Sequence, residues 1–199
     1  LGGGRAGPEE EHGAMKSIDL KRAFFDTVRQ HEFASPLEKA ALEEDMAAWT
    51  RHLTQAVIKT CQSQGWQAAA KGQRLHSLPE ARNEYLTIDV MAFPETQVHW
   101  PLPVAAFELE NNRDRIAYSF WKLLCLRVPI RVLFCYRQDC SERDSLIRML
   151  QDDILQSVNA LPEGDTLLVI GNRDESSVFP YGFFRWWHLN PNTARFNVI

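Results

Sequence analysis

Hydrophobic residues recur at two different spacings along the chain, and the change of spacing falls near Gly65. Before it, apolar residues repeat every three to four positions, which predicts helices. A short amphipathic helix is expected from Ser17. The stretch Ser35-Pro36-Leu37-Glu38 then combines a capping Ser, a Pro at the first helical position and a capping-box Glu. We therefore predict one long helix from Ser35 to near Gly65.

Beyond Gly65, short apolar runs bounded by Pro, Gly and Asn predict strands. These cover residues 66–70, 84–93, 104–110, 130–136, 166–170 and 179–189. One helix is expected from Arg113 to about Arg127, capped by Asn111-Asn112, and another from Ser141. Because Ser141–Ile170 follows a strand with a helix and another strand, part of the sheet should be parallel. The expected fold class is α/β, a mixed central sheet flanked by helices.

The length of 199 residues suits one domain with a sizeable core. Residues 1–14 are rich in Gly and Glu and predict a flexible tail, so the single domain is expected over residues 15–199. After the last predicted strand, Pro191-Asn192 is expected to begin a surface arm.

Composition narrows the class of protein. No stretch approaches the roughly 20 apolar residues that span a bilayer, and the N-terminus lacks the order of a secretory signal. The cysteines have no CxxC spacing and two lie in apolar runs, so we expect a reduced, cytoplasmic protein without membrane association. The net charge of −4 argues against a generic nucleic-acid coat. The six histidines show no metal-ligand spacing.

Acidic residues interrupt two of the predicted strands. Because successive side chains of a strand point to opposite faces, Glu108 and Glu110 share one face of the run 104–110. Asp89 interrupts the run 84–93 in the same way. A buried carboxylate without a partner costs several kcal/mol, so core strands rarely carry such residues without a role. If the two strands pair, three oxygen donors converge, and these suit Mg²⁺ or Mn²⁺.

Asp89, then Glu108-Leu109-Glu110 on the next strand and a helix after it, resembles the PD-(D/E)XK nuclease superfamily with a D…ExE variant of its motif. The resemblance covers residues 36–136 and implies a restriction-endonuclease-like core of helix, three strands, helix and strand. It also implies that Asp89 and Glu108 are metal ligands and that Glu110 stands where the family carries Lys.

The chain departs from the family at two points. Ile88 replaces the Pro before the Asp, and Glu110 replaces the Lys. Some members of the superfamily carry Glu at the third position, and others move the Lys onto the following helix, where Lys122 is the candidate. Lys122 belongs to a polar stripe with Arg115 and Ser119.

Two functions follow from these residues. In the first, the chain is a metal-dependent nuclease that hydrolyses DNA, with Glu110 or Lys122 orienting the attacking water. In the second, it is a catalytically degenerate nuclease-fold protein that binds a partner or nucleic acid. The acidic trio favours the enzyme, whereas the missing Lys and the negative charge favour the degenerate form.

Each candidate also has a structural interpretation. Glu108 and Glu110 could be solvated acids on an edge strand, Asp89 could bond a neighbouring turn, and Lys122 could face solvent. Arg113 and Arg115 could contact phosphate or simply be solvated. The aromatic run of residues 179–187 could pack the last strand onto the sheet, form a homodimer seam or stack on unpaired bases.

Overall fold

The computed structural model describes residues 8–199 except 77, 79, 81 and 97. Three helices precede three consecutive strands, and helical segments then separate the strands from β3 to β6. In chain order the elements are α1 (Pro8–Val28), α2 (His31–Leu42), α3 (Met46–Ser63), β1 (Trp66–Ala70), β2 (Val90–Pro94), β3 (Ala105–Leu109), α4 (Arg113–Leu124), β4 (Ile130–Arg137), α5 (Cys140–Met149), the π-helical turn η1 (Leu150–Ile154), the 3-10 turn η2 (Leu155–Ser157), β5 (Asp165–Asn172), the 3-10 turn η3 (Arg173–Val178), β6 (Phe184–Asn190) and β7 (Arg195–Val198).

All seven strands form one mixed sheet whose spatial order follows the chain from β1 to β7. β3, β4 and β5 are parallel to one another, and the outer pairs on both sides are antiparallel. The parallel pairs are joined through α4 and α5, as parallel connections require a crossover. The prediction of an α/β chain with a mixed, partly parallel sheet flanked by helices is confirmed.

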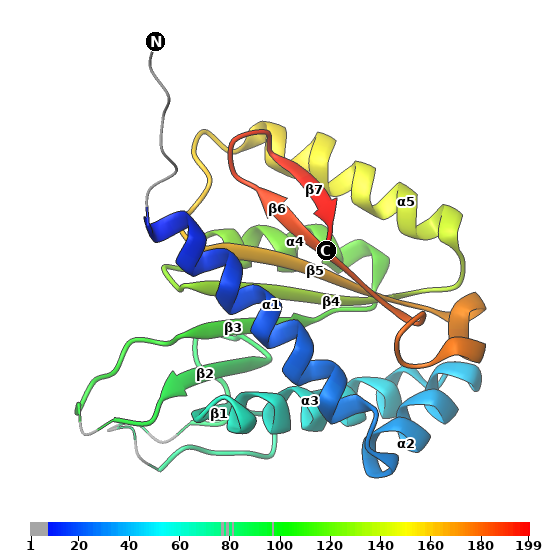
Figure 1. Ribbon diagram of the computed structural model, residues 1–199, viewed down its shortest axis with the longest axis horizontal. Coiled ribbons are helices and arrows are strands. Elements are labelled where there is room, and N and C mark those ends of the chain that lie inside the picture. The colour runs from blue at the N-terminus through cyan, green and yellow to red at the C-terminus, as the bar shows by residue number, and fades with distance from the viewer. Residues whose placement is uncertain (1–7, 77, 79, 81, 97) are drawn as a thin grey trace.

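The helices cover the sheet on two sides, and each side has its own core. α1, α2 and α3 pack on one face, where Phe24, Trp49 and Phe107 are buried. α4 and the segment from α5 to η2 pack on the other, where Ala106 and Phe120 are buried. In Figure 1, α1 crosses in front of the sheet and α4 lies behind it. The neighbours Ala106 and Phe107 enter different cores because side chains alternate along β3.

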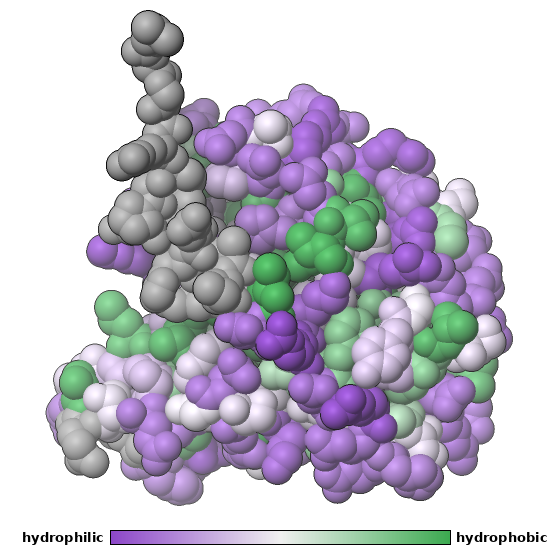
Figure 2. All heavy atoms as spheres, in the orientation of Figure 1, coloured by the Kyte–Doolittle hydropathy of each residue, from purple (hydrophilic) through white to green (hydrophobic). Residues whose placement is uncertain are grey.

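The surface on the side of α1 is mainly hydrophilic, with hydrophobic atoms gathered near the C-terminal end of the chain (Figure 2). Val198 of β7 is 71% exposed there. Within the described part of the chain, none of the helices combines the length and the apolar character that crossing a membrane requires.

The N-terminal helices differ from the prediction. The single helix expected from Ser35 to near Gly65 is wrong, because the chain breaks between α2 and α3 at Glu44, which has a φ of 56°. Asp45 caps α3 by accepting a hydrogen bond from the amide of Ala48 at 3.0 Å. Ser35 lies inside α2 and caps nothing.

The first helix begins earlier than the pattern from Ser17 predicted. α1 starts at Pro8, so residues 8–14 of the predicted tail are helical in backbone, and residues 1–7 lie outside the described residues.

The strand expected over residues 84–93 is shorter than predicted. β2 begins only at Val90, because Leu86 and Thr87 have φ values of 54° and 56° in the left-handed region. Asp89 therefore lies just before the strand instead of within it.

The C-terminal segment also differs. Residues 179–183 form a turn and β6 starts at Phe184, while the expected surface arm is replaced by β7, which pairs antiparallel with β6. Phe183, Phe184 and Trp186 are buried in the α1–α3 core, so these aromatic side chains pack the strand onto the sheet. The homodimer seam and the stacking of bases on this run stay predictions.

Candidate acidic site

The pairing of β2 with β3 brings Asp89 and Glu108 together. In the antiparallel register Val90 lies opposite Phe107, and continuing it by one residue places Asp89 opposite Glu108. The Oδ2 atom of Asp89 accepts a hydrogen bond from the amide of Leu109 at 2.8 Å. The predicted pairing of the two acidic segments is therefore confirmed.

Glu108 is the most buried member of the site. Glu108 is only 3% exposed. Its Oε1 atom lies 2.8 Å from the Nζ atom of Lys122, a residue of α4. Lys122 also donates to the carbonyl of Thr87 at 2.8 Å, so it ties the turn before β2 to β3. Glu108 is not a solvated acid on an edge strand, since β3 lies between β2 and β4.

Burial changes the ionisation of both acids. It raises the pKa of Glu108 to about 7, and the charge of Asp89 adds to the increase while Lys122 and a hydrogen bond with Ser119 reduce it. Burial also raises the pKa of Asp89, which the Leu109 amide and Lys122 lower in part. Near neutral pH, Glu108 is thus poised between its charged and protonated forms.

Glu110 is engaged differently. It follows β3 directly, and its Oε1 accepts a hydrogen bond from the amide of Asn112 at 2.9 Å. Asn112 itself caps α4, accepting from the amide of Asp114 at 3.0 Å, as its position predicted. Glu110 is within electrostatic range of Asp89, whose pKa it raises, but its side chain supports the turn into α4.

In an unbroken strand, Glu84 and Asp89 would face opposite sides of the sheet, since they are five residues apart. Because Leu86 and Thr87 turn the chain, the charge of Glu84 acts on Asp89 and raises its pKa. The sequence carried no clear signal of this turn, since left-handed φ values are rare for Leu and for a β-branched Thr.

The described residues fit a divalent cation only in part. Among them, no three His, Cys, Asp or Glu side chains come together as a group that could hold a metal ion. Buried Glu108 and half-buried Asp89 remain as two neighbouring carboxylates, and Mg²⁺ is commonly bound through one or two carboxylates with water or phosphate completing the shell. The donors of this pair therefore suit Mg²⁺ or Mn²⁺ as two ligands.

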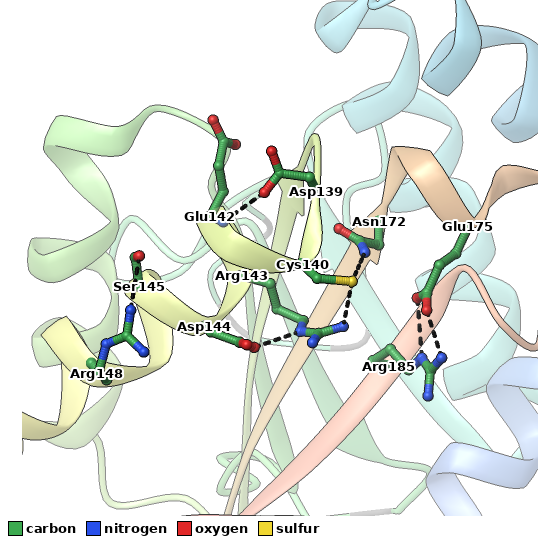
Figure 3. Close-up of polar contacts among 10 residues, drawn as sticks. All are labelled: Asp139, Cys140, Glu142, Arg143, Asp144, Ser145, Arg148, Asn172, Glu175 and Arg185. Carbon is green, nitrogen blue, oxygen red and sulfur yellow. Dashed lines mark hydrogen bonds and ion pairs between the residues drawn. The ribbon is translucent and has the colours of Figure 1, made fainter.

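A second polar cluster lies where β5 ends and α5 begins (Figure 3). The Sγ atom of Cys140 lies 3.4 Å from both the Nη1 of Arg143 and the Nδ2 of Asn172. Beside it, Arg185 of β6 and Glu175 of η3 form a bidentate ion pair. Nη2 of Arg185 lies 2.6 Å from Oε1 of Glu175, and Nε lies 3.1 Å from Oε2. These contacts join α5 to the neighbouring strands and involve neither Asp89 nor Glu108.

Comparison with protein-family models, with curated proteins and with solved structures gives no match. The interpretation of the site therefore rests on the residues and their geometry.

Proposed function

We propose that the chain has a restriction-endonuclease-like core and acts as a metal-dependent nuclease that hydrolyses phosphodiester bonds of DNA. The order of α3, three strands, α4 and β4 supports the fold, because it matches the order that the D…ExE resemblance implies. The observation that carries the function is that half-buried Asp89 lies opposite buried Glu108, and that Lys122 of the following helix contacts Glu108.

Each of these residues has a chemical role in the proposal. Asp89 and Glu108 would hold Mg²⁺ or Mn²⁺, and such an ion supplies Lewis-acid stabilisation of phosphate charge and a more acidic bound water. Lys122 places a cation beside Glu108, where it can orient a water molecule and offset negative charge on the phosphate. Glu110 fixes the turn that leads into α4.

The alternative function is that of a catalytically degenerate nuclease-fold protein that binds a partner or nucleic acid. Two contacts favour it. Lys122 already neutralises Glu108 through their ion pair, and Glu110 is turned toward the amide of Asn112. A protein of this kind would keep the acidic pair as a structural element and need no cation.

The experiment that separates these functions combines titration calorimetry of Mn²⁺ and Mg²⁺ with cleavage of plasmid and single-stranded DNA. It compares the wild type with Asp89→Asn and Glu108→Gln, which remove charge and keep shape. Lys122→Met tests the cation of α4, and Glu95→Gln, an exposed carboxylate after β2, is the matched control. Circular dichroism confirms that each variant folds.

The nuclease proposal expects cation-dependent cleavage that Asp89→Asn and Glu108→Gln abolish together with metal binding. It expects Lys122→Met to lose cleavage while it still binds the cation. Metal binding without cleavage by the wild type would favour the degenerate form. No binding at millimolar metal, together with no cleavage, would overturn the assignment of a metal site to this pair.

A further inference from the structure

β4 carries two buried arginines, and their guanidinium groups donate different numbers of hydrogen bonds. Arg131 is 1% exposed, and its guanidinium donates three hydrogen bonds to the carbonyls of Leu126 and Glu163. Arg137, at the other end of the strand, is 6% exposed but donates one hydrogen bond, to the carbonyl of its neighbour Tyr136. Among the described residues, no carboxylate lies within ion-pair distance of Arg137.

A buried cation whose N–H donors lack acceptors is costly, so this difference in hydrogen bonding needs a reason. A guanidinium has five N–H donors, and the three bonds of Arg131 show how this strand satisfies such a group when the role is structural. Arg137 lines a cavity of about 200 Å³ and an adjoining cavity of about 310 Å³.

The smaller cavity lies at the carboxyl ends of β3 and β4. Residues from four segments line it: Glu44, Met46, Asn111, Arg113, Tyr136, Arg137, Gln138 and Glu142. In open α/β sheets, the ends of parallel strands are the usual place for ligands. Its volume equals that of several water molecules in the liquid, enough for a group of phosphate size.

The carboxylates around the cavity already have partners. Glu142 is ion-paired with Arg113 and also accepts from the amide of Gln138, and Glu44 is ion-paired with Arg173. Figure 3 shows the carboxylate of Glu142 pointing away from the cluster around Cys140. Burial, and then the positive charge of Arg113, lower the pKa of Arg137, while Cys135 and the charge of Glu142 raise it. Among the described residues, Glu142 thus acts on this guanidinium from a distance, and no carboxylate forms an ion pair with it.

A polar group of the same cavity is also incompletely bonded. Asn111 has a buried Oδ1 without a hydrogen-bond partner among the described residues, while its Nδ2 donates to the hydroxyl of Thr50 at 3.3 Å. Because a hydroxyl can donate as well as accept, the amide can also bind Thr50 through its oxygen and offer its N–H groups to the cavity. Asn111 could then act as a further donor to an anion.

We propose that Arg137, together with Arg113, binds a phosphate group in the cavity at the carboxyl ends of β3 and β4. A guanidinium fork matches phosphate oxygens in charge and geometry. The group could belong to a nucleic-acid backbone or to a small phosphorylated molecule. This site is separate from the acidic pair and does not rest on the proposed nuclease activity, because an anion can bind here whether or not DNA is cleaved.

The test measures the binding of inorganic phosphate and of a single-stranded oligothymidylate by titration calorimetry at constant ionic strength. It compares the wild type with Arg137→Met and Arg113→Gln. Arg127→Gln, an exposed arginine after α4, is the matched control. Arg113 has a side chain 68% exposed, so its variant keeps the test decisive if Arg137→Met fails to fold.

We expect Arg137→Met to weaken phosphate binding by about tenfold or more, since a charged hydrogen bond is lost, and Arg113→Gln to weaken it by a smaller factor. Arg127→Gln should bind as the wild type does. A parallel loss of oligothymidylate binding would identify the backbone of a nucleic acid as the source, and loss for phosphate alone would identify a small phosphorylated molecule. No phosphate binding by the wild type, or equal binding by wild type and Arg113→Gln, would overturn the proposal.

Discussion

Glu108 is expected to make the folded chain less stable as pH rises, and the variant Glu108→Gln isolates this effect. The residue is 3% exposed, and burial raises the pKa of its carboxyl group to about 7 from an ordinary value of 4.5. The folded chain therefore binds this proton more tightly than the unfolded chain does. Gln keeps the size of Glu and an oxygen that can accept from Lys122, but it cannot ionise.

The size of the effect follows from these two pKa values. The contribution of Glu108 to the free energy of unfolding is fully present below pH 4.5 and falls as the pH rises to about 7. At about 1.4 kcal/mol for each pH unit between the two values, the loss is about 3 kcal/mol. Glu108→Gln should match the wild type near pH 4.5 and exceed its stability by about 2–3 kcal/mol above pH 8.

The measurement is urea denaturation at several pH values, followed by tryptophan fluorescence. Trp49 and Trp186 are buried and report the loss of the α1–α3 core. Subtracting the wild-type curve from that of the variant cancels the titrating groups that do not interact with Glu108, and Glu95→Gln controls for the removal of one surface charge. A difference that stays constant between about pH 5 and pH 8.5, or a variant that loses more stability at high pH, would refute the reasoning.

Three further predictions concern the packing and the thiols. Gly164→Ala should cost about 2 kcal/mol or more in urea denaturation, because Gly164 has a φ of 92° and an added Cβ would lie 2.3 Å from the carbonyl oxygen of Pro129; unchanged stability would contradict this geometry. Asp45→Ala should cost about 1 kcal/mol through loss of the α3 cap, measured in the same way, while Asp45→Asn should retain most of the stability. Cys61 and Cys135 should resist a maleimide reagent until urea unfolds the chain, since burial raises the pKa of Cys61 and raises that of Cys135 to about 12. Labelling of either thiol in the native protein, detected by mass spectrometry, would contradict their burial.

The sequence by itself determined the features that depend on local spacing. Alternation along residues 104–110 predicted that Glu108 lies on a different face from Phe107, and the two cores confirm it, because the period of a strand is a property of the backbone. The cap at Asn112 was also predictable from local sequence, because an Asn side chain readily accepts a hydrogen bond from an amide in the first turn of a helix. The charged end of the run IRVLFCYR could also have marked Arg137 as a buried cation, since alternation puts it on the same face as Arg131.

Only the tertiary structure decided which of these groups meet. The turn at Leu86 and Thr87 is held by Lys122, 35 residues further along the chain, and no local pattern encodes such a contact. The break at Glu44 was hidden because apolar residues keep helical spacing across it. Partners of a buried charge come from distant segments brought together by packing. For this reason the sequence could show that Glu108 and Arg137 are charged residues in apolar runs. Only the fold gave Glu108 an ion-pair partner in Lys122 and left Arg137, among the described residues, with a backbone carbonyl and no ion pair.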